Sequence, residues 1–237
     1  MLEDVVNFNE VPIDNKKFTE KCRRELNQNG VVTLHNFLKF ETVTELVEEA
    51  KSRSNLAFFT NSTHNVYLTP KNKDLAPEHV FNRQLSSSKG CITTDQIPDN
   101  SKLKELYFSN IFKNFICNVV EEEALFEYAD PLSSINVHYA AKGQELNWHF
   151  DNSKFAITLL LQAPDGGGHF EYVSNLRNAE KDEMNFSGVE SVLNGETNAV
   201  KTIIPLALTS HAPISTVLTP PDGIPVHIQL FISPCPV

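Results

Sequence analysis

Cysteine is scarce in this sequence and forms no paired motif. The 237 residues include four cysteines, and none of them lies in a C-x-x-C pair. This distribution predicts neither a disulfide framework nor a thiolate zinc site. The N-terminal residues lack the basic and then apolar order of a signal peptide, and no apolar run approaches the ~18 residues of a membrane span. We therefore expect a soluble, cytoplasmic protein that does not bind membranes.

Positive charge is also scarce. The chain has 20 Lys and Arg against 30 Asp and Glu, a formal net charge of -10, and its largest basic cluster is Lys21, Arg23 and Arg24. Such a composition provides no electrostatic attraction for nucleic acid, so a small-molecule partner is expected instead. The length and a hydrophobic content of 41% suffice for one domain over residues 1–237. The oligomeric state stays open.

Helical signals dominate residues 1–125. Asp14 is a candidate cap for a helix at 16–29 that ends at Gly30, and a short strand is expected directly after it. Apolar residues at three- and four-residue spacing predict further helices at 41–52 and 101–122. The polar residues between 61 and 100 predict long loops, which either surround a site or merely wrap the domain. This half is expected to be a helix-rich flank.

Short apolar runs separated by turn residues characterise residues 131–237. They predict a β-rich core, either a sandwich or a barrel, that shares its interior with the helical flank. The expected strands are 134–139, 146–150, 155–162, 169–173, 199–204, 214–218 and 226–232.

His149 and Asp151 are the first candidates for a chemical role. They are two residues apart, and on a strand such residues project from the same face. An imidazole and a carboxylate together suit a divalent metal such as iron(II), and a second histidine from a distant strand would complete a facial triad. The alternative is a chance H-x-D match, which is common.

Several segments around this pair form a recognisable set of motifs. They are Asn147-Trp-His-Phe-Asp-Asn-Ser-Lys-Phe-Ala-Ile-Thr-Leu-Leu-Leu-Gln162, the following Phe170-Glu-Tyr-Val173, and upstream Asn82-Arg83, Lys89-Gly-Cys-Ile-Thr-Thr-Asp-Gln-Ile-Pro98 and Asn136-Val-His-Tyr139. Together they resemble the core of iron(II)/2-oxoglutarate oxygenases. The similarity extends over residues 81–195 and is strongest to the branch of free-amino-acid hydroxylases and their halogenase relatives. It implies an α+β fold with a mainly β core, a double-stranded β-helix of the jelly-roll or cupin type, with flanking N-terminal helices.

The resemblance implies a cofactor and a reaction. In enzymes of this kind the protein positions Fe(2+) and the co-substrate 2-oxoglutarate, and the metal supplies the oxidative chemistry. Halogenation occurs in this branch where a small residue replaces the motif carboxylate and leaves room for a halide. Because Asp151 occupies that position here, the resemblance implies hydroxylation of a small polar substrate such as a free amino acid.

The C-terminal end departs from the family pattern. The usual ending resembles S-x-H-R-V-T-P, a glycine turn and an arginine on the last strand, but Thr216 stands at the histidine position and His227 at the arginine position. His211 is the nearest substitute third ligand, or else an exposed loop histidine. No Lys or Arg follows Lys201. A catalytically impaired pseudo-enzyme that keeps the fold is therefore the alternative function.

Further candidates come from the same resemblance and the strand pattern. Asn136, Tyr139 and His227 are expected to contact 2-oxoglutarate, although Tyr139 would fit the core equally well and His227 would fit a hydrogen bond to a neighbour. A protonated His227 would replace the guanidinium only weakly, through one charge-assisted hydrogen bond. Arg83 or Arg177 would be an alternative clamp for the co-substrate.

The substrate site is expected to include Arg83, Asn152 and Glu171. A buried Glu171 carboxylate would suit the ammonium group of an amino acid. Alternatively, Glu171 lies on an edge strand and faces water.

Overall fold

The computed structural model describes residues 1–128, 130, 132–141, 143–151, 153–163, 170–174, 176–177, 183–202, 206–210, 226–230 and 232–233. Its helices are α1 (Leu2–Val5), α2 (Lys16–Asn29), α3 (Phe40–Arg53), α4 (Lys102–Tyr107), α5 (Asn110–Val119) and α6 (Phe186–Leu193), with 3-10 turns η1 (Ser54–Leu56), η2 (Val80–Asn82) and η3 (Thr94–Gln96). Its strands are β1 (Val31–Thr33), β2 (Phe58–His64), β3 (Leu85–Ile92), β4 (Phe126–Glu127), β5 (Ile135–Tyr139), β6 (Phe155–Gln162), β7 (Phe170–Tyr172), β8 (Val200–Thr202), β9 (Leu206–Ser210), β10 (Val226–Leu230) and β11 (Ile232–Ser233).

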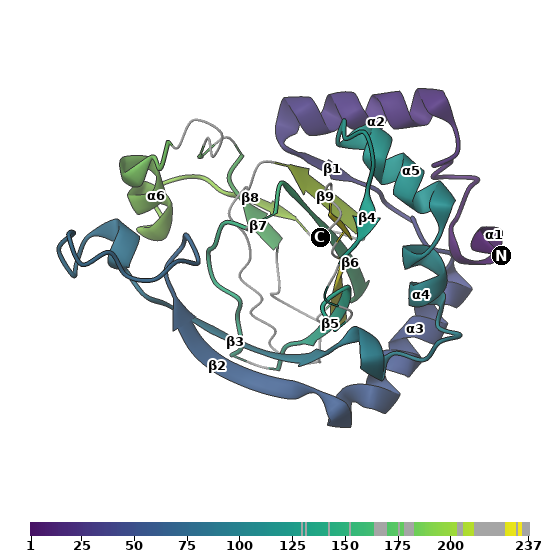
Figure 1. Ribbon diagram of the computed structural model, residues 1–237, viewed down its shortest axis with the longest axis horizontal. Coiled ribbons are helices and arrows are strands. Elements are labelled where there is room, and N and C mark those ends of the chain that lie inside the picture. Colours follow the sequence, from purple (N-terminus) through teal and green to yellow (C-terminus); the bar gives the residue numbers. More distant parts are fainter. Residues whose placement is uncertain are drawn as a thin grey trace.

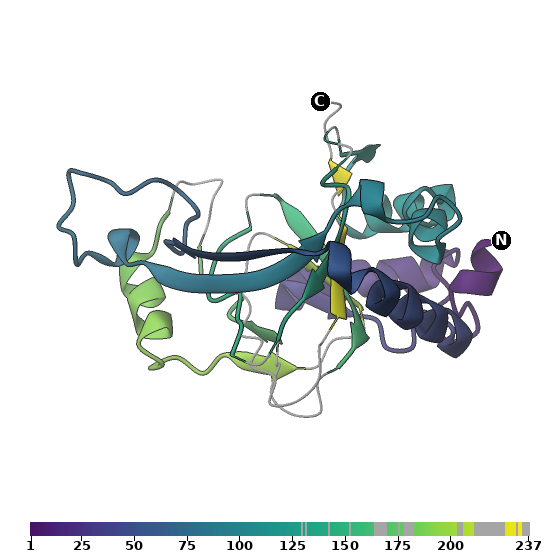
Figure 2. The ribbon, with the colours of Figure 1, turned by 90° about the horizontal axis from the view of Figure 1, so that it is seen from below.

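Seven of these strands form one antiparallel sheet in the order β1-β9-β6-β10-β5-β3-β2. Strand β10, near the C-terminus, lies between β5 and β6, so the centre of the sheet joins strands that are far apart in sequence. A separate pair, β7 and β8, lies apart from the long sheet, and a third pair joins β4 to β11 (Figure 2). The order β9-β6-β10-β5 together with the β7–β8 pair is the strand arrangement of a double-stranded β-helix.

Helices α2 to α5 cover one side of this β structure, and α6 lies on the opposite side (Figure 1). Helix α2 begins where the Asn15 side chain accepts hydrogen bonds from the backbone amides of Lys17 and Phe18. It ends at Gly30, whose φ of 72° is a left-handed conformation that favours glycine. Asn15, not the expected Asp14, is therefore the N-cap. The expected helix at 101–122 is two helices, because Ser109 breaks the run and caps α5.

The main core lies between the helices and one face of the sheet. On β5, Ile135, Val137 and Tyr139 are buried in this core, and Ile157 on β6 and Ile228 on β10 join them. These residues alternate with polar ones because successive side chains of a strand point to opposite faces. We call the helix-covered side the outer face and the other side the inner face.

A second apolar cluster lies at the other end of the molecule. Phe150 is fully buried there against Tyr67, whose ring is 5.4 Å from it between centroids, and α6 contributes Val189 and Val192. This second cluster connects the long segment between β2 and β3 to the segment that carries His149 and Asp151. It therefore anchors Phe150 from the side away from the helices.

The expectation of loops throughout residues 61–100 was wrong. Strands β2 and β3 pair along seven positions, from Phe58 with Cys91 to His64 with Leu85. Their polar composition lacks the apolar alternation that predicts a strand, because β2 is an exposed edge strand and the inner face of β3 is itself polar. The first 125 residues thus contain two strands, β2 and β3, beyond the expected helices and the expected strand after Gly30.

Other boundaries also differ from expectation. Residues 144–151 form no strand, apart from a single bridge residue at His149, so the strand expected at 146–150 was wrong, and Asn147 has a φ of 57°. Strand β9 and helix α6 were not expected, and the strand expected at 214–218 lies outside the described residues. In the part of the chain that the structure describes, no helix is both long and apolar enough to span a membrane.

Candidate metal centre

The inner face of the sheet is polar across several strands. Strand register places Cys91 of β3 opposite His138 of β5, and Asn136 of β5 opposite Gln229 of β10. Lys89 lies two residues from Cys91 on the same face. Such a face is expensive to bury without partners, so its polarity indicates a binding region rather than a core.

His149 and Asp151 lie together beside this face. The His149 Nε2 and Asp151 Oδ1 atoms are 3.4 Å apart, and the two side chains are only 16% and 20% exposed. Phe150, between them, is fully buried in the second apolar cluster. The imidazole and the carboxylate thus approach each other although the segment forms no strand, while the buried phenyl ring anchors the segment in the second apolar cluster.

Two backbone hydrogen bonds and one side-chain contact hold this segment in place. The Ser88 amide donates a hydrogen bond to the Glu145 carbonyl at 2.7 Å, and the Phe150 amide donates to the Val66 carbonyl at 2.8 Å. The His64 Nε2 lies 3.2 Å from the Leu146 carbonyl, and its ring meets the His149 ring edge-on with 5.9 Å between centroids. The β2–β3 hairpin therefore positions the segment that carries the pair.

The tautomer of His149 follows from its backbone contact. Its Nδ1 lies 3.0 Å from the Asn147 carbonyl, which can only accept a hydrogen bond. Nδ1 must then carry a proton, and Nε2 is the nitrogen available toward Asp151. Metal-binding histidines commonly donate their second nitrogen to a carbonyl in this way, which fixes the orientation of the ring.

The electrostatics of the pair favour a charged imidazole when no cation is bound. Burial lowers the pKa of His149, but the hydrogen bond and charge of Asp151 and the Asn147 carbonyl outweigh it and raise the pKa overall. The positive charge of Lys89 opposes this rise. A divalent cation would displace the Nε2 proton, so metal binding here would release a proton.

The pair fits two of the three ligands of an iron(II) site. Nitrogen and oxygen donors bind first-row metals at about 2.1 Å, so two donors up to about 4.2 Å apart can share one cation. The observed 3.4 Å satisfies this condition. Within the described ranges, no three His, Cys, Asp or Glu residues are grouped for metal binding. His211 and Thr216 lie outside those ranges.

The expected co-substrate residues fall on different faces. Asn136 lies on the inner face, and its buried Oδ1 has no hydrogen-bond partner among the described residues. Tyr139 lies on the outer face, where its hydroxyl donates to the Ala50 carbonyl of α3 at 2.8 Å and burial raises its pKa to about 12. Tyr139 thus packs in the core, the second of its two alternatives. The backbone of His227 pairs with His138.

The expected substrate residues are dispersed. The Arg83 guanidinium donates to the Asn194 side chain at 2.8 Å and to the Leu193 carbonyl at 3.2 Å, beyond the C-terminal end of α6. Glu171 is half-buried on β7, between two aromatic residues that pack against Val31 of β1. Asn152 lies outside the described residues.

Lys89 and His64 were not among the expected site residues. Both lie in the polar stretch that was interpreted as loops, so the sequence did not predict that they lie on strands. The one available signal was the alternation of Lys89 with Cys91, which becomes informative once β3 is known. Arg177 has its guanidinium carbon 4.2 Å from the centre of the Phe150 ring, and its buried Nε has no hydrogen-bond partner in the described part of the chain.

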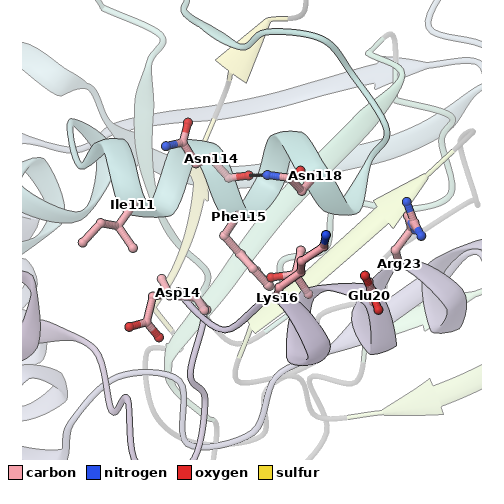
Figure 3. A pocket seen from close by; sticks show the side chains of 10 residues that line it. Asp14, Lys16, Glu20, Arg23, Ile111, Asn114, Phe115 and Asn118 are labelled. Carbon is pink, nitrogen blue, oxygen red and sulfur yellow. Dashed lines mark hydrogen bonds between the residues drawn. The ribbon is translucent and has the colours of Figure 1, made fainter.

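A surface pocket of about 460 Å³ lies between α2 and α5, in the helical layer (Figure 3). Asp14, Lys16, Glu20 and Arg23 line one wall, and Ile111, Asn114, Phe115 and Asn118 line the other. These charges are of mixed sign on open helix surfaces. The pocket therefore offers no alternative to the inner face as a chemical site.

Solved structures share this fold. The chain is similar to an oxidoreductase of the 2OG-Fe(II) oxygenase family from Burkholderia pseudomallei, with 13% identity, 93% of each chain covered and a TM-score of 0.55. It is similar to a prolyl hydroxylase from Trichoplax adhaerens, with 15% identity, 96% and 93% coverage and a TM-score of 0.57. The non-heme alpha ketoglutarate dependent epimerase SnoN gives 10% identity, 92% and 84% coverage and a TM-score of 0.62.

These likenesses define the class: the chain has the double-stranded β-helix fold of the 2-oxoglutarate and iron(II) oxygenases, as the sequence resemblance implied. Residues 13–204 match the Halogenase D family, and the chain belongs to that family. The match ends before Thr216, where the sequence departs from the usual histidine. No curated protein matches the chain.

Proposed function

We propose that this protein is an iron(II)- and 2-oxoglutarate-dependent oxygenase that hydroxylates a small polar substrate, such as a free amino acid. The observation that carries the proposal is the His149 Nε2 and Asp151 Oδ1 pair at 3.4 Å, with the second nitrogen of His149 occupied by the Asn147 carbonyl. Family membership and the polar inner face support it.

His149 and Asp151 would hold the metal, which when bound supplies dioxygen-dependent oxidation of a C–H bond. The protein itself orients the two metal ligands and limits their exposure to solvent. The Asn147 carbonyl fixes the His149 ring, and Phe150 locks the segment between the two ligands. Because the Asp151 carboxylate occupies a ligand position, it leaves less room for a halide than a small residue would, and hydroxylation is favoured over halogenation within this family.

The primary test is turnover with a panel of free amino acids, Fe(II), 2-oxoglutarate and air. We expect succinate formation and a product heavier by one oxygen atom. Asp151→Asn should lower turnover by more than ~100-fold, because even changes to residues behind metal ligands cost 10- to 100-fold. Asp74→Asn, at an exposed carboxylate, is the matched control. Wild-type turnover that survives Asp151→Asn would contradict the assignment.

The second candidate is a pseudo-enzyme that keeps the fold without turnover. Thr216 at the expected histidine position is the observation that favours it. Anaerobic addition of Fe(II) and 2-oxoglutarate separates the two, because an assembled site gives a visible charge-transfer band. If neither the band nor succinate appears, the pseudo-enzyme is the correct function. Thr216→His with His227→Arg should then restore the band.

A further inference from the structure

Lys89 is a partly buried cation on the inner face of the sheet. It lies on β3, and strand alternation puts it on the same face as Cys91, which pairs with His138 on the neighbouring β5. Its charge acts on His149, and the Asp151 charge acts on it in turn. Burial lowers the pKa of Lys89. The strand register thus places Lys89 on the inner face, the face that also carries Cys91 and His138.

No described residue neutralises this ammonium directly. In the described ranges, the side chain of Lys89 donates no hydrogen bond and forms no ion pair, although Asp151 is near enough to affect it electrostatically. Even a partly buried charge without a hydrogen-bonded partner is unfavourable. Its presence is accounted for if an anionic ligand completes the site.

The last strand lacks the cation that the family pattern places there. No Lys or Arg follows Lys201, and His227 occupies the arginine position. The backbone of His227 pairs with His138, which pairs with Cys91 in turn. Lys89 is therefore two strands away from β10, roughly 10 Å, on the face that carries the binding region.

We propose that Lys89 binds the far carboxylate of 2-oxoglutarate and replaces the arginine that is missing from the last strand. This inference rests on the proposed function. Asn136, whose Oδ1 lacks a described partner, lies on the same inner face between β3 and β10. A lysine ammonium is a compact charge that suits a single carboxylate, and it reaches the ligand from a different strand than the usual guanidinium.

The test compares two oxoacids on the full chain loaded with Mn(II), which avoids turnover. The first is 2-oxoglutarate, and the second is 2-oxopentanoate, which has the same carbon chain but a methyl group in place of the far carboxylate. Calorimetry should show that wild-type protein prefers 2-oxoglutarate. Lys89→Met should weaken 2-oxoglutarate binding about 10- to 100-fold and change 2-oxopentanoate binding less than about twofold.

Two further variants control for charge and folding. Lys89→Arg should keep most of the preference for 2-oxoglutarate, and Lys21→Met, at an exposed lysine on α2, should leave both affinities unchanged. The thermal midpoint of ligand-free Lys89→Met should equal or exceed that of the wild type, because an unpaired and partly buried charge has been removed.

Each remaining outcome overturns a defined claim. If Lys89→Met keeps the wild-type preference, or weakens both oxoacids equally, the Lys89 inference is wrong while the oxygenase proposal stands. If Lys89→Met keeps both affinities but raises the KM of the substrate, the ammonium binds a substrate carboxylate instead. If wild-type protein binds neither oxoacid, the proposed function and this inference both fail.

Discussion

The outer and inner faces of the seven-stranded sheet are built from the same strands but differ completely in chemistry. On β5, Val137 and Tyr139 pack beneath the helices, whereas Asn136 and His138, which alternate with them, belong to the inner face. The outer face buries apolar surface, which stabilises the fold. The inner face buries polar groups, which contribute little to stability unless they are paired. The difference indicates that stability and ligand binding are assigned to opposite sides of one sheet.

The largest effect is expected at Phe150, which contributes both to the stability of the fold and to the ligand-binding site. Phe150→Ala should lower the free energy of unfolding by about 3–5 kcal/mol, because it leaves a cavity in the second apolar cluster. It should also abolish 2-oxoglutarate binding, since Phe150 orients His149 and Asp151. Chemical denaturation and calorimetry measure the two effects. Phe108→Ala, at a phenylalanine that is 48% exposed, is the control, and an equal loss in both variants would contradict the role of Phe150.

Two neighbouring residues on β6, one on each face, test whether the two faces contribute differently to stability. Ile157→Ala on the outer face should cost about 2–5 kcal/mol of unfolding free energy, because Ile157 is fully buried in the main core. Thr158→Ala, one residue further and on the inner face, should cost less than about 1 kcal/mol. Urea denaturation measures the loss of unfolding free energy in each variant, and the two losses can then be compared. Similar losses at the two positions would mean that the faces do not divide stability as proposed.

A smaller effect is expected at Tyr139. Tyr139→Phe removes the hydrogen bond to the Ala50 carbonyl and should cost about 0.5–1.5 kcal/mol. Because the hydroxyl is on the outer face, affinity for 2-oxoglutarate should stay unchanged. Thermal unfolding and calorimetry on the same preparation check both statements. Weaker 2-oxoglutarate binding without a change in stability would assign Tyr139 to the co-substrate after all.

The smallest effect is the pH dependence caused by Lys89. Its folded-state pKa is lowered by burial from the ordinary value of 10.5, so the unfolded chain binds this proton more strongly. Stability from this group is therefore complete above pH 10.5 and is lost as the pH falls through the folded-state pKa. Lys89→Met should be more stable than wild type at neutral pH, and the difference should shrink toward pH 10.5. A difference that grows with pH would have the wrong sign.

Elements with a clear apolar period were predicted well from the sequence. Helix α2 and strand β6 have the expected bounds of 16–29 and 155–162. Strands β2 and β3 were missed because their residues are polar, and that polarity reflects an exposed edge and a polar inner face. The sequence pattern could not distinguish either situation from a loop.

The sequence by itself determined the H-x-D pair and the absence of Lys and Arg from residues 202–237. Only the tertiary structure decided that Tyr139 faces the helices and that Lys89 lies on the inner face with Cys91 and His138. The physical reason is the distance along the sequence between the residues that meet. The two-residue spacing of His149 and Asp151 is a local feature of the sequence, whereas the meeting of β3, β5 and β10 depends on packing between segments that are far apart in the chain.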